Sequence, residues 1–116
     1  MRMEIRGRNV EMTDDLRDLV SKRFNRLGRQ VSSLATLDVV LYEERNPSIS
    51  DCQVAEATVR LKGATLHARE ASPEMAVSIH KLADDVRRQV KKHRELMRKR
   101  KVTRRVMGQM RGRPAT

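Results

Sequence analysis

The period at which apolar residues recur changes along this chain in an order that limits the folds open to it. Apolar and polar residues alternate, as in strands with one buried face, over residues 3–8, 37–42, 53–61 and 64–70. Apolar residues recur instead at spacings of three and four, as in amphipathic helices, over residues 13–28 and 72 to about 100. The expected element order is therefore β-α-β-β-β-α.

Capping and turn residues mark where these elements begin and end. Thr13 is a good N-cap for the first helix, and Gly28 is a natural stop behind it. The dipeptide at 62–63 is short enough to turn a hairpin between the third and fourth strands. Ser72 is expected to cap the second helix, with Pro73 as its first helical residue.

These elements predict one α+β domain followed by a tail. Two amphipathic helices and a four-stranded sheet bury their apolar sides best when both helices pack on one face of the sheet. A chain of 116 residues supports one modest core rather than two linked domains, and we place that domain in residues 1–100. Residues 101–116 mix Gly, Pro and Arg without a clear period, which predicts a basic tail that is disordered when unbound.

The positive charge of the chain is confined to its last third. Residues 1–80 carry equal numbers of acidic and basic side chains, so the whole net charge of +11 lies in residues 81–116. Residues 86–105 alone contain eleven Lys or Arg and one acid, Glu95. A solvated helix face normally interleaves acids with its cations, so this run favours a surface that binds a polyanion.

Helical geometry groups the cations on particular faces, at about 100° per residue. Lys22, Arg26 and Arg29 share an arc beside the apolar stripe of the first helix, with Arg23 at its margin. On the second helix the cations occupy one flank and the side away from the core, and they become one surface with the first set if the helices lie side by side. The candidates on the second helix are Arg87, Arg88, Lys91, Lys92, Arg94, Arg98 and Lys99.

The composition of the chain helps to decide whether such a surface binds an anionic membrane or a nucleic acid. A membrane-surface helix exposes large apolar residues opposite its charges, whereas this stripe is needed to cover the sheet, so we expect no membrane partner. The sequence has neither a membrane span nor a signal peptide, and we expect a cytosolic protein. Phe24 and Tyr42 are the only aromatics and are not placed as a stacking platform, which favours recognition of the phosphates and shape of a folded RNA.

The residues give little reason to expect catalysis, a cofactor or a metal. His67, His80 and His93 lack ligand spacing, and the single cysteine, Cys52, cannot form an internal disulfide. We therefore expect no metal, no cofactor, no small-molecule substrate and no enzyme activity. One alternative stays open, because the segment 107–110 faintly resembles the Gly-Gly-Gln loop of peptide release factors, which would assign peptidyl-tRNA hydrolysis to Gln109.

Two motifs resemble the ribosome hibernation-promoting factors, also called ribosome-associated inhibitors or ribosomal subunit interface proteins. The opening motif, Gly-Arg-Asn followed by an acid-capped helix ending in Lys and Leu, is matched by residues 7–9, Thr13, Lys22 and Leu27. The closing helix matches at Met75, Ile79, Arg88, Gln89, Lys91, Lys92 and Arg94. The resemblance covers residues 1 to about 95 and departs from the family pattern at Ala76, His80, Asp85 and Arg87.

The resemblance implies a fold and a partner. Members of that family have the β-α-β-β-β-α fold, similar to double-stranded RNA-binding domains, and inhibit translation by occupying the mRNA and tRNA channel of the small ribosomal subunit. It adds Arg8 to the residues expected to bind ribosomal RNA, and it implies a short form without the C-terminal dimerising domain. We expect a monomer when free. A non-ribosomal double-stranded RNA-binding or nucleoid DNA-binding module is the alternative.

Overall fold

The structure is a computed structural model that describes the backbone of residues 1–46 and 48–111 and the side chains up to residue 108, without that of residue 47. Its elements follow one another as strand, helix, three strands and helix, which confirms the expected α+β order. In chain order they are β1 (Arg2–Arg8), α1 (Asp14–Phe24), the 3₁₀ helix η1 (Asn25–Arg29), β2 (Thr36–Glu43), β3 (Gln53–Leu61), β4 (Ala64–Ser72) and α2 (Met75–Arg111).

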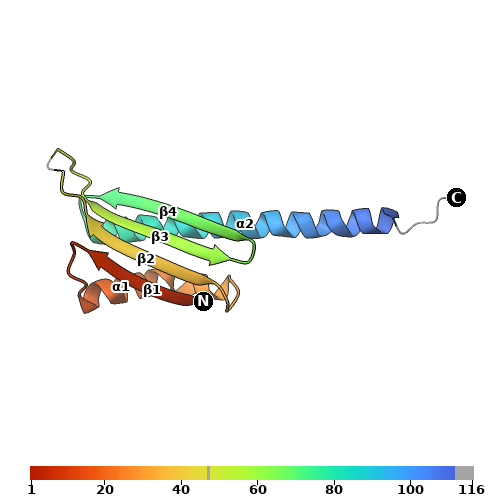
Figure 1. Cartoon of the computed structure of the whole chain (residues 1–116), viewed down its shortest axis with the longest axis horizontal. Coiled ribbons are helices and arrows are strands. Elements are labelled where there is room, and N and C mark those ends of the chain that lie inside the picture. The colour runs from red at the N-terminus through yellow and green to blue at the C-terminus, as the bar shows by residue number, and fades with distance from the viewer. Residues whose placement is uncertain (47, 112–116) are drawn as a thin grey trace.

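The four strands form one mixed sheet in the order β1-β2-β3-β4. β1 runs parallel to β2, since α1 carries the chain back between them, whereas β2, β3 and β4 form an antiparallel meander. The expected hairpin at 62–63 is confirmed, and Gly63 supplies its positive φ of 79°. Both helices cover the same face of the sheet, as Figure 1 shows, and the other face is open to solvent.

The core lies between the sheet and the two helices. Alternate residues of β2, namely Leu37, Val39 and Leu41, are fully buried on the helix side, as the period of two predicts. Phe24 is 1% exposed and is among the largest of the fully buried side chains. The helices contribute the rest of their apolar stripes to the same cluster: Val20, Leu27, Ile79, Leu82, Ala83, Val86 and Val90.

The helix ends differ from the expected ones. Thr13 caps α1 as predicted, with its hydroxyl accepting from the Leu16 N–H at 3.2 Å, but Gly28 does not stop an α-helix because the chain has already tightened into η1. Ser72 is the last residue of β4 and not the N-cap of α2. Its buried hydroxyl lies 2.7 Å from that of Ser78, so it joins β4 to the first turn of α2.

The predicted end of the second helix near residue 100 is wrong, because α2 continues to Arg111. The missed segment, 101–111, is rich in Lys, Arg and Met, which favour helix, and its one glycine costs only about 1 kcal/mol. A helix of 37 residues is about 55 Å long, whereas a nine-residue strand spans about 30 Å, so α2 must outrun the sheet. Figure 1 shows α2 continuing alone beyond the β3–β4 turn. Residues 112–116 lie outside the described part of the chain.

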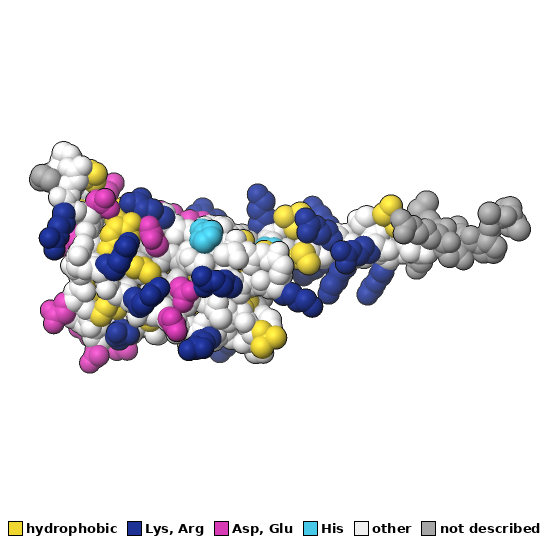
Figure 2. All heavy atoms as spheres, viewed as in Figure 1, with side chains coloured by type: hydrophobic (Ala, Val, Ile, Leu, Met, Phe, Trp, Pro, Cys, Tyr) yellow, Lys and Arg dark blue, Asp and Glu magenta, His cyan; other side chains and the backbone are white. Residues whose placement is uncertain are grey.

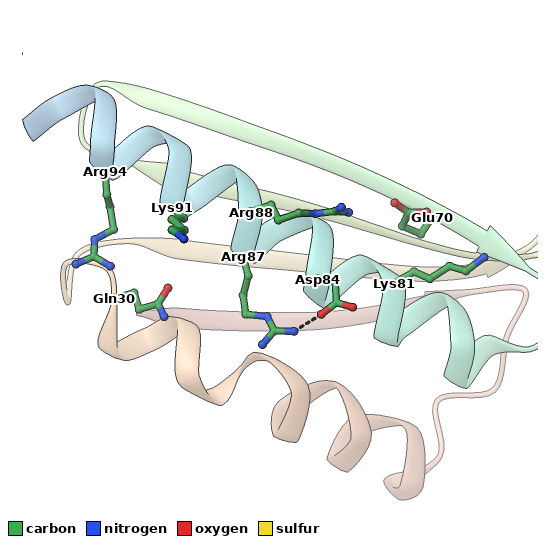
Figure 3. A pocket seen from close by; sticks show the side chains of 8 residues that line it. All are labelled: Gln30, Glu70, Lys81, Asp84, Arg87, Arg88, Lys91 and Arg94. Carbon is green, nitrogen blue, oxygen red and sulfur yellow. Dashed lines mark hydrogen bonds and ion pairs between the residues drawn. The ribbon is translucent and has the colours of Figure 1, made fainter. Parts of the chain in front are cut away.

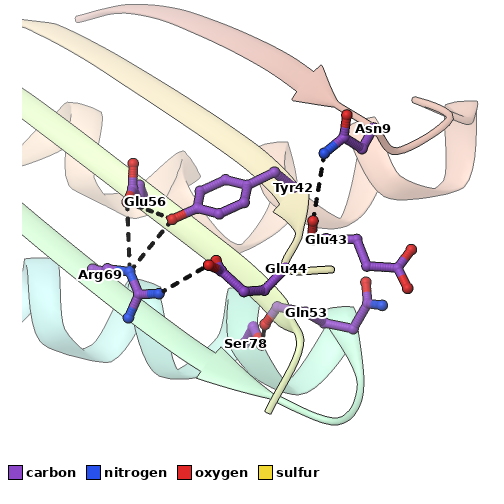
Figure 4. Close-up of polar contacts among 8 residues, drawn as sticks. All are labelled: Asn9, Tyr42, Glu43, Glu44, Gln53, Glu56, Arg69 and Ser78. Atoms are coloured by element: carbon purple, nitrogen blue, oxygen red, sulfur yellow. Dashed lines mark hydrogen bonds and ion pairs between the residues drawn. The ribbon is translucent and has the colours of Figure 1, made fainter. Parts of the chain in front are cut away.

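The turn after β1 explains the Gly-Arg-Asn motif. A Cβ on Gly7 would come within 2.6 Å of Met12 Cγ and 2.8 Å of the Val10 carbonyl oxygen, so only glycine fits there. Asn9 adopts a left-handed φ of 58°, which asparagine tolerates better than most residues. Its side chain lies 3.5 Å from the Glu43 carbonyl oxygen at the end of β2 (Figure 4), so the motif ties β1 to its neighbour.

Candidate nucleic-acid interface

The contact between α1 and α2 creates a cationic hollow. Because the two helices lie side by side on the sheet, Arg87 of α2 faces the last turn of α1 and η1. Each of the cations concerned is exposed to solvent, although Arg87 also forms an ion pair with Asp84. The predicted candidates that line this hollow are Lys22, Arg23, Arg26, Arg29 and Arg87.

A second hollow continues along the outer side of α2. Arg87 lines both hollows, and Figure 3 shows it reaching from α2 toward α1. The same view shows Gln30 near Arg94, which lies closer to the C-terminal end of α2. We call the two hollows together the helix surface. It brings together eight of the predicted cations: Lys22, Arg23, Arg26, Arg29, Arg87, Arg88, Lys91 and Arg94.

The structure does not bring the other four predicted residues onto this surface. Lys92 and Lys99 are exposed elsewhere on α2, and Arg98 lines a separate hollow beside the β3–β4 turn. Arg8 lies on the opposite, open face of the sheet, where its guanidinium stacks on the Tyr42 ring at 4.7 Å from the ring centroid. Arg8 therefore cannot share one flat ligand with the helix cations.

The open face of the sheet carries charges of both signs that pair with one another. Tyr42 donates to Glu56 at 2.8 Å, and Arg69 lies 3.6 Å from Glu56 and 3.9 Å from Glu44 (Figure 4). The hydrogen bond to Tyr42 is the main cause that raises the pKa of Arg69. Figure 2 shows acidic and basic side chains interspersed over this face, which leaves it with little net attraction for a polyanion.

Sequence reasoning missed the acid that sits inside the helix surface. Asp84 forms an ion pair with Arg87, and its carboxylate also lies 3.6 Å from the His80 ring nitrogen Nε2. This carboxylate therefore places a negative charge within the helix surface. Sequence reasoning also missed Lys81, which lines the same hollow. The signal for Lys81 was its spacing of seven from Arg88, which places both on one side of a helix.

A carboxyl group marks the edge of the helix surface on β4. Burial is the largest cause that raises the pKa of Glu70, and the neighbouring carboxylate of Asp85 acts in the same direction. The cations Lys81 and Arg88 act against this rise. Glu70 and Asp85 therefore form the acidic boundary of the cationic surface next to β4, the edge strand of the sheet.

The described residues contain neither a cluster for a metal ion nor a helix that could span a membrane. Within the described part of the chain, no three His, Cys, Asp or Glu side chains lie close enough to hold a metal ion. None of the described helices has an apolar stretch long enough to cross a bilayer. The side chain of Gln109, on which the hydrolase alternative depends, lies outside the described residues.

Fold and surface together define a class: a small α+β domain that presents a cationic face built from two neighbouring helices. The chain belongs to the family described as Sigma 54 modulation protein / S30EA ribosomal protein, whose model matches residues 3–98. The family that the two sequence motifs resemble is thereby confirmed. The similarity to double-stranded RNA-binding domains stays a prediction.

Relatives and solved structures agree with this assignment. The chain is 32% identical over 98 residues to the ribosome hibernation promoting factor of Salmonella typhimurium, covering 84% of this chain and 98% of the relative. It is 31% identical over 96 residues to the ribosome hibernation promotion factor of a Picosynechococcus strain, covering 82% of this chain but only half of that longer relative. The crystal structure of the Thermus thermophilus Protein Y N-terminal domain matches with a TM-score of 0.67 and 30% identity, covering 80% of this chain and 99% of that one. A ribosomal subunit interface protein from Coxiella burnetii shares the fold, with a TM-score of 0.70 at 20% identity, covering 82% and 99%.

Proposed function

We propose that this protein binds the small ribosomal subunit through its helix surface and inhibits translation by occupying the channel for mRNA and tRNA. The observation that carries the proposal is the continuous set of eight exposed cations, on a domain whose relatives are named ribosome hibernation promoting factors. Each phosphate that these cations neutralise releases condensed counterions, which supplies affinity without base recognition. Occupancy blocks the channel, so no bond is made or broken and the protein is not an enzyme.

The proposal assigns the parts of the chain different tasks. Residues 1–100 bind the ribosome as a monomeric domain in the cytoplasm, and residues 101–116 extend the basic surface as a tether. Arg98 and Lys99 continue the cationic side of α2 toward this tether, and both are exposed. Lys92 lies one helical turn from Arg88 and contacts RNA beside the helix surface, whereas Arg8 acts from the open face, only where RNA wraps around the domain.

Sedimentation of a cell lysate through a sucrose gradient tests the proposal. We expect the protein to travel with the 30S fraction at low salt and to leave it as salt is raised, because a phosphate-bound protein loses affinity as counterions compete. Protein that stays at the top of the gradient at low salt would contradict the proposal. Release from the subunit by equal concentrations of bulk duplex RNA or DNA would support a general nucleic-acid-binding module instead.

Replacing the acid within the helix surface should tighten binding. In Asp84→Asn the carboxylate that faces incoming phosphate disappears and Arg87 is freed, so we expect affinity for the subunit to rise about fivefold, the equivalent of about 1 kcal/mol. Fluorescence anisotropy with labelled protein and purified 30S subunits measures the change. Asp38→Asn is the matched control, since Asp38 pairs with Arg60 on the open sheet face. An equal gain in both variants, or weaker binding by Asp84→Asn, would argue against a phosphate site at Arg87.

A further inference from the structure

A hollow lies where α2 leaves the sheet, beside the helix surface but distinct from it. Its walls come from three parts of the chain: the segment after η1, the β3–β4 turn and residues 90–104 of α2. Figure 1 shows the β3–β4 turn alongside α2 at the point where the helix continues alone. We call this hollow the junction notch.

The floor of the junction notch is apolar. Val90 is fully buried, and Val31 and Leu61 are half-buried and pack against the core. Met97 completes the floor and is 38% exposed, so the apolar lining opens to solvent at its outer end. Concave sites with an apolar lining and a few polar groups are typical of those that bind small organic groups.

The rim of the junction notch is cationic and carries no compensating acid. Five cations line it: Lys62, Arg94, Arg98, Lys101 and Arg104. Among residues 1–46 and 48–108, none of these five forms an ion pair with a carboxylate, in contrast to Arg60 and Arg69 on the open sheet face. A ligand that satisfies both floor and rim must combine a flat apolar part with negative charge.

An unpaired nucleotide has this combination. Its base presents two apolar faces and its phosphate a negative charge, whereas a base within a duplex is stacked and out of reach. His93 and Gln30 lie in the same hollow and supply polar groups for the base edge. The guanidinium planes of Arg94 and Arg98 can stack on the base, which replaces the aromatic platform that this sequence lacks.

Continuity with the helix surface favours RNA over an acidic peptide as the occupant. Arg94 lines both the helix surface and the junction notch, so a strand whose duplex part lies on the helix surface reaches the notch without a gap. An acidic peptide confined to the notch would satisfy the rim, Arg94 included, but would leave the adjoining cations of the helix surface unused. We propose that the junction notch takes the base of one unpaired RNA nucleotide, an inference that rests on the proposed RNA-binding function of the helix surface.

Three RNA hairpins of equal length test the proposal by fluorescence anisotropy. The first is fully paired, the second carries one bulged adenosine, and the third carries an abasic residue at the bulge. We expect the full-length protein to bind the bulged hairpin about tenfold more tightly than either of the others, since docking one base contributes about that factor. Equal affinity for the bulged and abasic hairpins would overturn the proposal, because only the base distinguishes them.

A pair of neighbouring substitutions localises the effect to the notch. Met97→Glu places a carboxylate on the floor and should abolish the preference for the bulge, whereas Leu96→Glu makes the same charge change at a residue that does not line the notch. Both side chains are substantially exposed, at 38% and 46%, so both variants should fold. Leu96→Glu should weaken binding to the three hairpins equally and keep the tenfold ratio. The same ratio in both variants would overturn the proposal.

Two further outcomes separate this inference from the proposed function. A bulge preference that Met97→Glu removes supports the notch even if the protein fails to sediment with 30S subunits, in which case only the ribosomal function is lost. Displacement of the bulged hairpin by an acidic peptide with leucine side chains, at a lower concentration than by free RNA, would overturn the nucleotide and assign the notch to a protein partner.

Discussion

Charge reversal of Arg26, Arg87 and Lys91 is expected to weaken binding to the small ribosomal subunit by more than about 100-fold at low salt. Arg26 comes from η1 and Arg87 and Lys91 from α2, and together they line both hollows of the helix surface, so the triple variant interrupts the surface along its whole length. Each lost phosphate contact lowers the slope of log affinity against log salt by about 0.7 to 0.9. The slope should therefore fall by about 2 to 3.

Binding measured from 50 to 200 mM salt separates specific contacts from general attraction. With eight phosphate contacts the wild type should lose about 10⁴-fold in affinity over this range, and the variant only a few hundred-fold. The control variant reverses Arg2, Arg17 and Arg45, which are exposed and do not line the helix surface, and has the same net charge. It should retain the wild-type slope. A slope that falls equally in the two variants would show that net charge, and not the helix surface, drives binding.

The fold was predictable because each element carries a period that burial enforces. Leu37, Val39 and Leu41 alternate because β2 has one face on the core, and the stripe of α2 recurs at three and four because its other sides face solvent. The same alternation along β1 could have shown that Arg8 does not lie on the same side of the sheet as the helix cations. Arg8 lies an odd number of residues from Met3 and Ile5, which face the core, so it belongs to the open side of the sheet.

Two parts of the molecule were hard to predict from the sequence. Beyond the sheet the described side chains of α2, residues 94–108, are all exposed, so burial does not fix its course there. Val102 and Val106 are spaced by four, as in a helix, but this signal is much shorter than the buried stripe of residues 79–90, and helix propensity carries α2 to Arg111. The junction notch is assembled from three segments, with Val31, Leu61 and Met97 about 30 residues or more apart. No spacing rule connects such residues, because the contact depends on where the second helix crosses the end of the sheet.

Truncation of Phe24 to alanine is expected to lower the free energy of unfolding by about 3 to 5 kcal/mol. Phe24 is the only phenylalanine of the chain, is 1% exposed, and packs in the core at the last turn of α1. The other core side chains are aliphatic, so no neighbour can fill the cavity that the lost ring would leave. A domain of this size is stable by about 5 to 15 kcal/mol, so the change removes a large share of its stability.

Urea denaturation followed by circular dichroism measures this loss, with Leu34→Ala as the control. Leu34 is 89% exposed, so its truncation should change the unfolding free energy by less than about 0.5 kcal/mol. The effect on binding follows from position, because Phe24 anchors the end of α1 from which Arg26 faces Arg87 across the hollow. In conditions where Phe24→Ala is still folded, affinity for the subunit should also fall, as the two sets of cations lose their fixed spacing. A loss of stability below about 1 kcal/mol would contradict this account, since the position of α1, and with it the helix surface, would then be fixed by other contacts.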